Sequence, residues 1–263
     1  MTLKLKKGGL VVSCQARADN PLHGAHFMGA MAFAARQVVT RPLSRLLAGV
    51  ESLAEGDYDG AVELWETVLV EHPLDVLALR LAHYLHFYLG GGAAMRDSLA
   101  RVLPRWHETT PGFASVLGMY AFGLEETGDY AAAEEAGRQA VALNPGDIWS
   151  VHAVAHVMEM QGRHREGITW IADGAEAWSA CNNFAYHLWW HKALYYIEQD
   201  NSDAALALYD KRVRDDFSDV VYDIHDAAAL LWRLELADMG VGRRWDEMAD
   251  KVAARIDDHF DNF

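Results

Sequence analysis

The sequence predicts an all-α solenoid built of about six helix-turn-helix repeats. Three observations predict it: a segment of the chain recurs at a fixed interval, the turn residues between helices are regularly spaced, and strand signals are absent outside Gly9 to Ser13. A sequence period of about 20 to 50 residues is typical of solenoid proteins, in which each repeat packs only on its neighbours.

The repeat is visible when the chain is compared with itself. The string EGDY at 55–58 recurs as TGDY at 127–130, a shift of 72 residues, and the same shift carries Pro73 onto Pro145. Between these points the turn positions lie alternately 34 and 38 residues apart; they are Gly56, Gly90, Gly128, Gly162 and Asp200. A unit of about 34 residues is the tetratricopeptide length. The predicted class is therefore a tetratricopeptide-type right-handed α-solenoid.

The residue types at the matching positions have physical reasons. Glycine takes positive φ at little cost, and aspartate caps the free N–H groups of the helix that follows, so both suit a turn between helices. Pro73 and Pro145 lack the N–H that would continue a helix, so each ends the second helix of its repeat.

These signals place the helices in order along the chain. The first helices of the repeats (A helices) are expected at 43–55, 74–89, 113–127, 147–160, 183–198 and 220–237. The second helices (B helices) are expected at 59–71, 94–107, 131–143, 164–177, 202–214 and 243–258. A further helix is expected at 24–38. No linker rich in Pro and Ser divides the chain, so we predict one solenoid domain over 23–259, with an N-terminal extension at 1–22 and a tail at 260–263.

The composition limits which partners and which cellular compartment we expect for the chain. The 23 Lys and Arg against 38 Asp and Glu give a net charge of −15, which repels nucleic-acid phosphates and anionic lipids. Cys14 and Cys181 are the only cysteines, too few for a disulfide framework, and they favour a reducing cytoplasmic location. No apolar run approaches the ~18 residues of a membrane span. We expect no nucleic acid, no membrane and no signal peptide.

Histidines gather on the predicted A helices, which face the concave groove of a tetratricopeptide array. On the helix at 147–160, His152, His156 and Glu159 lie within about 60° of arc. The helix at 183–198 repeats the pattern with His187 and His191. Imidazole and carboxylate are ligands of divalent transition metals, so these five residues are candidates for catalysis or metal binding. Structural histidines that bond each other, backbone or water are the alternative.

Other candidates form an aromatic wall with a positive group. Arg80, Tyr84, Phe122, Trp149 and Trp190 suit a small ligand with an apolar body and an anionic end, because arginine binds carboxylate in a bidentate fork. Aromatic residues that only pack the repeats are the alternative. By contrast, His83 and His86 fall at positions that face a B helix, where we expect core packing.

Asp226 on the last A helix has two interpretations. It shares a helix face with Arg233, so the structural interpretation is a buried ion pair between the two. The functional interpretation is a ligand-binding residue that caps the histidine site.

Several strings resemble the tetratricopeptide repeat protein 38 family. They lie at 73–79, 118–126, 149–162, 189–191, 209–210 and 226–234. The resemblance implies a right-handed helical-repeat fold and maps the family's two histidine helices onto His152, His156 and Glu159 and onto His187 and His191. The chain is shorter than typical members, and 27–30 (FMGA) lacks the histidine expected after Met-Gly.

Two functions follow from these patterns. The first is a groove lined by His and Trp that binds a small polar or anionic ligand, with or without a reaction that uses a metal or acid-base histidine. The second is a scaffold that binds a peptide, where an acidic chain favours basic sequences. Exposed repeat ends also allow a homo-oligomer.

Overall fold

The computed structural model describes residues 2–6, 9–13, 43–181 and 184–254. These residues form two compact units, of which the first runs up to Val154 and the second begins at Ala155. The division falls inside one helix. The predicted helix at 24–38 and the tail at 260–263 lie outside the described residues, and the single domain over 23–259 stays a prediction.

Unit 1 begins with a two-stranded hairpin. Strands β1 (Thr2–Lys6) and β2 (Gly9–Ser13) are antiparallel, with Thr2 opposite Ser13 and Lys6 opposite Gly9. From the sequence we expected a strand only at Gly9 to Ser13. The strand at Thr2–Lys6 was not predicted. Alternating Lys and Leu gives that strand a period of two, which is a strand signal in a short segment.

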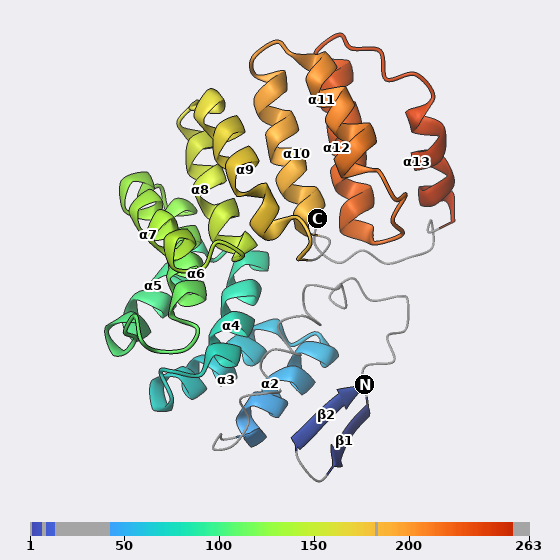
Figure 1. Cartoon of the computed structure of the whole chain (residues 1–263). Coiled ribbons are helices and arrows are strands. Elements are labelled where there is room, and N and C mark those ends of the chain that lie inside the picture. Colours follow the sequence, from blue (N-terminus) through green and yellow to red (C-terminus); the bar gives the residue numbers. More distant parts are fainter. Residues whose placement is uncertain (1, 7–8, 14–42, 182–183, 255–263) are drawn as a thin grey trace. The chain divides into compact units, whose positions relative to one another are not determined.

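The rest of unit 1 consists of antiparallel helix pairs in which consecutive helices pack on each other (Figure 1). The helices are α2 (Leu43–Glu55), α3 (Tyr58–Glu71), α4 (Val76–Tyr88), α5 (Gly92–Val102), α6 (Phe113–Glu125), α7 (Tyr130–Leu143) and the first part of α8 (Ile148–Met160). The predicted helix at 94–107 ends early: α5 gives way to a 3-10 helix at Leu103–Arg105, which contains Pro104.

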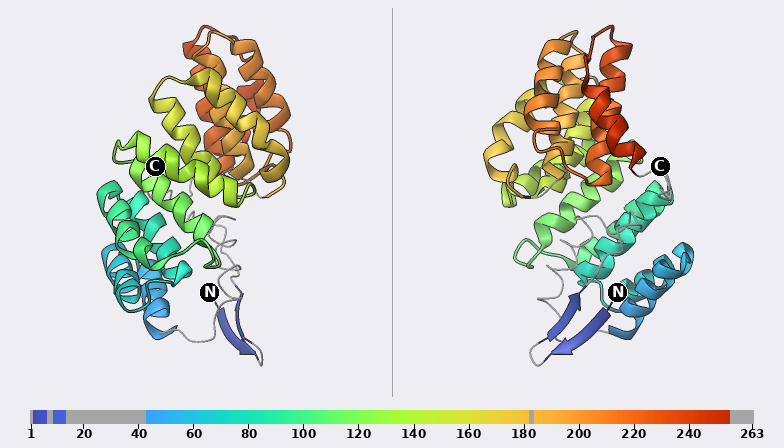
Figure 2. Two further views of the ribbon diagram at one scale, coloured as in Figure 1. Left: turned by 60° about the vertical axis from the view of Figure 1, so that its left-hand side comes forward. Right: turned by 90° about the vertical axis from the view of Figure 1, so that its right-hand side faces the viewer.

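Unit 2 continues the same pattern. It contains the end of α8, then α9 (His164–Trp178), α10 (Phe184–Ile197), α11 (Ser202–Leu208), α12 (Val221–Leu236) and α13 (Arg244–Ala253). Helix α10 packs against α9, α11 and α12, and α12 packs against α13 (Figure 2). The helix predicted at 202–214 is α-helical only in its first half, since α11 is followed by a π-helical turn at Tyr209–Val213.

Repeated caps and turns explain why the helices start and stop where they do. The side chains of Asp57, Asp75, Asp129 and Asn201 accept hydrogen bonds from first-turn N–H groups of the helices they precede. All five predicted turn positions have positive φ: Gly56, Gly90, Gly128, Gly162 and Asp200. A sixth follows at Asp238, 38 residues after Asp200, with φ of 58°. The predicted helix-turn-helix arrangement is confirmed, although the last interval is 38 residues where the alternation would give 34.

Glycine at these turns gives a testable prediction about stability. A Cβ at Gly128 would meet nothing within 4 Å, so alanine there costs only the left-handed backbone, about 1 to 2 kcal/mol of unfolding free energy. Gly240 is equally open but has no positive φ, so Gly240→Ala is the matched control and should be neutral or slightly stabilising. Urea denaturation of both variants measures the change in unfolding free energy. Equal changes in the two variants would contradict a special backbone requirement at Gly128.

Buried aromatic side chains fix the helix spacing inside each unit. In unit 1, Trp65 is 1% exposed and its ring fills the space a Cβ at Gly49 would need. In unit 2, Gly167 of α9 lets the fully buried ring of Tyr195 approach, and the Tyr195 hydroxyl donates to the Ala155 carbonyl oxygen at 2.6 Å. Tyr195 thereby joins the end of α8, α9 and α10.

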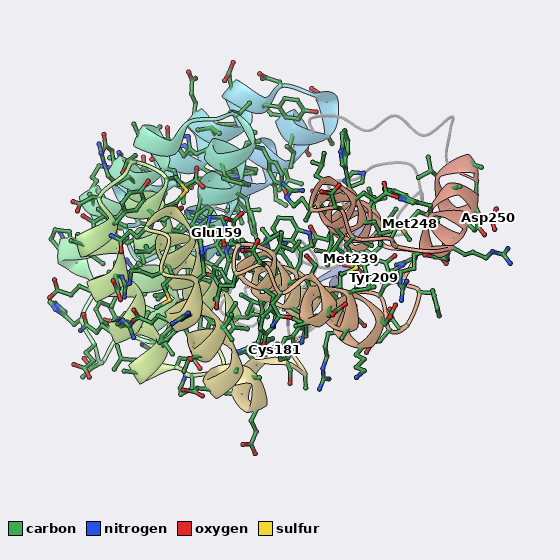
Figure 3. The ribbon with its side chains drawn as sticks, turned by 90° about the horizontal axis from the view of Figure 1, so that it is seen from above. Glu159, Cys181, Tyr209, Met239, Met248 and Asp250 are labelled. Atoms are coloured by element: carbon green, nitrogen blue, oxygen red, sulfur yellow. The ribbon has the colours of Figure 1, made fainter. Side chains whose placement is uncertain are left out.

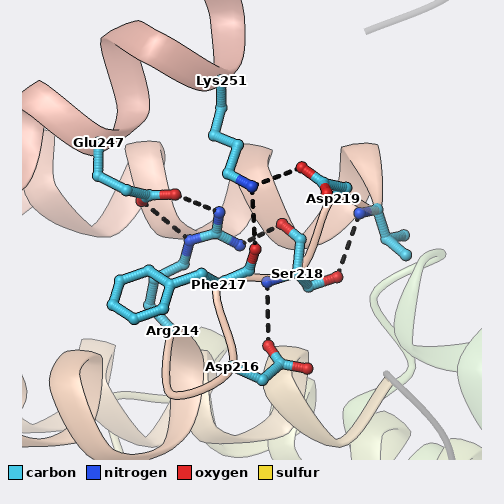
Figure 4. Close-up of polar contacts among 8 residues, drawn as sticks. Arg214, Asp216, Phe217, Ser218, Asp219, Glu247 and Lys251 are labelled. Carbon is cyan, nitrogen blue, oxygen red and sulfur yellow. Dashed lines mark hydrogen bonds and ion pairs between the residues drawn. The ribbon is translucent and has the colours of Figure 1, made fainter.

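A buried arginine attaches the last helix of unit 2 (Figure 4). The side chain of Arg214 is 1% exposed and donates two hydrogen bonds to the Glu247 carboxylate of α13, at 3.1 and 2.7 Å. It donates a third to the Ser218 carbonyl oxygen at 2.6 Å. Lys251 adds an ion pair to Asp219, so the loop before α12 and helix α13 hold each other.

No helix in the described part of the chain combines the length and the apolar character that a bilayer crossing requires.

Candidate functional site

The candidate site of unit 2 is a cluster of three histidines, His156 of α8 and His187 and His191 of α10. The Nε2 atoms of His187 and His191 lie 3.1 Å apart. The ring centroids of His156 and His191 are 4.6 Å apart, as are those of His187 and His191. Ring nitrogens of all three lie within 4.8 Å of one another. We call these three residues the histidine cluster.

An aspartate orients the cluster. The Oδ2 atom of Asp226 on α12 lies 2.9 Å from Nδ1 of His187. A carboxylate accepts from an N–H, so the proton of a neutral His187 ring belongs on Nδ1, and Nε2 presents its lone pair to His191. Of the two interpretations of Asp226, the ion pair with Arg233 is not formed among the described residues, because the approach of α12 to α10 gives Asp226 the partner His187. The guanidinium of Arg233 lies 5.3 Å above the ring of Trp190.

Burial favours the neutral form of the central ring. His191 is 4% exposed, and burial, with the neighbouring rings of His187 and His156, holds its pKa well below the ordinary value. A neutral imidazole offers one nitrogen lone pair, which is the form that binds metals or accepts protons.

Trp190 packs against the cluster, and Glu159 is a largely buried carboxyl on α8. The Trp190 ring stacks on His187 at 5.4 Å and 11°, and its Nε1 is buried without a hydrogen-bond partner among the described residues. Burial, reinforced by the charge of Glu198, raises the pKa of Glu159 to about 7 despite the opposing charge of Arg233. Figure 3 marks Glu159 on the ribbon. The carboxyl of Glu159 is therefore partly protonated at neutral pH.

The structure thus brings together some of the residues of the predicted histidine site. His156, His187, His191, Trp190 and Asp226 come together within unit 2. The ring of His152 packs in unit 1 against Phe122, at 5.5 Å, and Trp149, at 5.3 Å. That His152 and Glu159 complete the site stays a prediction.

The predicted aromatic wall of unit 1 is a second candidate site, the Arg80 cluster, formed by Arg80, Tyr84, Phe122 and Trp149. The Arg80 guanidinium lies 4.2 Å above the Tyr84 ring and 4.4 Å from the centroid of the Trp149 ring. It donates one hydrogen bond of 2.6 Å to the Tyr84 hydroxyl. The rings of Phe122 and Trp149 are 4.9 Å apart. These side chains come from the A helices α4, α6 and α8, as expected.

The two histidines assigned to the core do lie there. His86 is 3.0 Å from Glu66 of the B helix α3, as its position predicts. His83 is 1% exposed, and its ring contacts Phe122 and Trp149 of the A helices. Its packing role is confirmed.

The sequence did not reveal the pairing of His187 with Asp226, since the two are 39 residues apart on different helices. The available signal was their placement on the inner faces of consecutive A helices, which pack side by side in such arrays.

Comparisons with known proteins support the fold. A tetratricopeptide repeat protein of Thermus thermophilus superposes with a TM-score of 0.54 at 22% identity, over 72% of this chain and 98% of that one. Another, from Parabacteroides merdae, gives 0.51 at 15% identity, over 88% and 91%. The fold is that of tetratricopeptide repeat proteins. Apart from the hairpin, the predicted all-α solenoid class is confirmed.

Sequence comparisons add little to this. No family model matches the chain. A protein of Clostridium perfringens named as a putative N-acetylmannosamine-6-phosphate 2-epimerase is 57% identical over 35 residues, 13% of this chain. The chain spans only 16% of the length of that protein, and a match this short does not indicate a shared activity. The resemblance to the tetratricopeptide repeat protein 38 family stays a prediction.

Proposed function

We propose that this chain is a cytoplasmic binding protein that recognises the carboxylate group of its partner through the Arg80 cluster of unit 1. The observation that carries the proposal is the state of the Arg80 guanidinium. It lies against the rings of Tyr84 and Trp149 and is bonded to one hydroxyl, and no carboxylate of the described residues forms an ion pair with it. In a chain of net charge −15, a guanidinium left without an acidic partner is available to an anion from outside.

The donor geometry favours a planar oxyanion. Arginine carries five N–H donors in a fixed fork, and the Tyr84 hydroxyl occupies one of them. The rings of Tyr84 and Trp149 hold the fork still, which reduces the ordering cost when a carboxylate binds in bidentate geometry. The fully buried ring of Phe122 packs against Trp149 and so supports that ring from the interior.

Two sources can supply such a group, a small organic acid or the C-terminus of a peptide. The tetratricopeptide fold favours the peptide as the second candidate, because helical-repeat surfaces are extended and bind long partners. Both sources share the carboxylate, so a test of that group comes first.

Matched acid and amide probes test the proposal. We expect 3-phenylpropanoate to shift the indole N–H signal of Trp149 in an assigned NMR spectrum, and 3-phenylpropanamide to bind about 10-fold more weakly or worse, since it leaves the charged fork without its charged partner. Peptides that end in phenylalanine, as free acid and as amide, distinguish the second source.

Arginine variants complete the experiment. Arg80→Gln should abolish the preference for the acid, whereas Arg105→Gln, at an exposed arginine of the 3-10 helix, should leave it unchanged. Equal binding of acid and amide by the unaltered protein, or an unchanged preference in Arg80→Gln, would rule the proposal out.

A further inference from the structure

We propose that the histidine cluster of unit 2 is a binding site for one divalent transition metal, with His156, His187 and His191 as the ligands and Asp226 as the outer partner of His187. This site is separate from the Arg80 cluster and does not depend on the function proposed for it.

The spacing of the two nearest nitrogens fits a shared metal. Metal–imidazole bonds of about 2.05 Å place two ligand nitrogens about 3.3 Å apart in a tetrahedral site and about 2.9 Å apart at the edge of an octahedral one. The observed 3.1 Å between the Nε2 atoms of His187 and His191 lies between these values. A hydrogen bond between two neutral rings has a similar length, so the experiment has to separate the two.

The outer partner supports the metal over a simple hydrogen bond. Histidines that bind metals commonly donate their other N–H to a carboxylate, which fixes the tautomer and raises the basicity of the ligating nitrogen. Asp226 stands in that relation to His187, at 2.9 Å from Nδ1. The arrangement presents the His187 Nε2 lone pair on the side where His191 and His156 lie.

An orphan donor points to a further group at the site. The buried Nε1–H of Trp190 has no hydrogen-bond partner among the residues that the structure describes, although its ring lies against both His187 and His191. Buried N–H groups are usually satisfied. A water or anion on the open position of a three-histidine metal would accept from it.

The donor set identifies the class of metal. Three imidazoles suit Zn²⁺, Co²⁺, Ni²⁺, Cu²⁺ or Fe²⁺, whereas Mg²⁺ and Ca²⁺ prefer oxygen ligands. Three protein ligands with an open fourth position are typical of zinc sites that exchange a bound water.

Cobalt provides the probe. The full chain is stripped with a chelator, dialysed and titrated with Co²⁺, and the visible absorption of the bound ion is followed, with Zn²⁺ as competitor. We expect one Co²⁺ per chain, displaced by Zn²⁺ but not by Mg²⁺. The proposal would be overturned if Co²⁺ binding did not saturate, or if Mg²⁺ displaced the bound Co²⁺ as well as Zn²⁺ does.

Variants assign the ligands. Asp226→Asn should weaken the affinity about 10- to 100-fold, as loss of an outer partner does. His156→Gln and His187→Gln, which remove ligands, should weaken it more. His225→Gln is the matched control, since this exposed histidine is next to Asp226 on α12.

Circular dichroism and thermal melts verify that each variant folds. If the two histidine variants fail to fold, the comparison of Asp226→Asn with His225→Gln still decides. Unchanged affinity in Asp226→Asn, or equal losses in both variants, would show that the metal binds elsewhere on the chain.

Discussion

Replacing Glu247 by alanine is expected to lower the free energy of unfolding by about 3 kcal/mol, because it leaves the Arg214 guanidinium buried without its counter-charge. Arg214 is 2% exposed, and Glu247 accepts two of the three hydrogen bonds that the guanidinium makes (Figure 4). Loss of one partner of a buried pair costs about 3 to 5 kcal/mol. We take the low end, since the side chain of Glu247 is 26% exposed and water can enter its place. Urea denaturation measures the change.

A double variant and a surface pair provide the controls. Arg214→Met combined with Glu247→Ala removes the charge as well as its partner, so it should cost less than Glu247→Ala alone. The pair of Arg243 with Asp246, at the start of α13, is largely exposed at 94% and 59%, so Asp246→Ala should change stability by less than about 1 kcal/mol. If Glu247→Ala costs no more than Asp246→Ala, the buried pair does not hold α13.

Replacing Glu159 by glutamine is expected to stabilise the protein at high pH, by up to about 3 kcal/mol at pH 8. The pKa of Glu159 is raised to about 7, first by burial and then by the charge of Glu198. A carboxyl with a raised folded pKa contributes stability that is complete below its unfolded pKa of about 4.5 and is lost as the pH rises through 7. Glutamine stays neutral, so its advantage should appear over that window and then level off.

The pH profile of the difference isolates this carboxyl. Burial also lowers the pKa of His83 and His191, which weakens the fold as the pH falls, but both histidines are present in both proteins and their effect cancels. Glu235→Gln, at an exposed position on α12, should show a flat difference. A flat difference for Glu159→Gln would mean that its carboxyl is ordinarily ionised in the folded protein.

Local chemistry determines most of what the sequence predicts correctly. Glycine at positive φ and aspartate at helix starts act over a few residues, so the sequence alone places the turns at Gly56, Gly90, Gly128 and Gly162. From the turns follow the A and B helices. The end of α5 and the π-helical turn Tyr209–Val213 depend on packing between helices, which a periodic pattern does not contain.

The candidate sites follow the same division. The spacing of His187 and His191 on one helix predicts that they share a face, and their Nε2 atoms are indeed adjacent. Which aspartate meets which partner depends on how α10 and α12 are set against each other. From the sequence, Arg233 was a candidate partner for Asp226 because both lie on one face of the same helix. In the structure Asp226 pairs with His187 of another helix. Contacts across helices are the part that spacing alone cannot assign.

The aspartates at the last two turns have a consequence for how such proteins are recognised. Asp200 and Asp238 adopt the left-handed conformation that glycine adopts at the four preceding turns, and aspartate is among the few other residues that tolerate it. A search pattern that requires glycine at the turn would therefore stop at Gly162 and miss the final two repeats. Divergence can remove the sequence mark of a repeat while the backbone angle that defines it is retained. Repeat number in related chains is better counted from φ than from glycine.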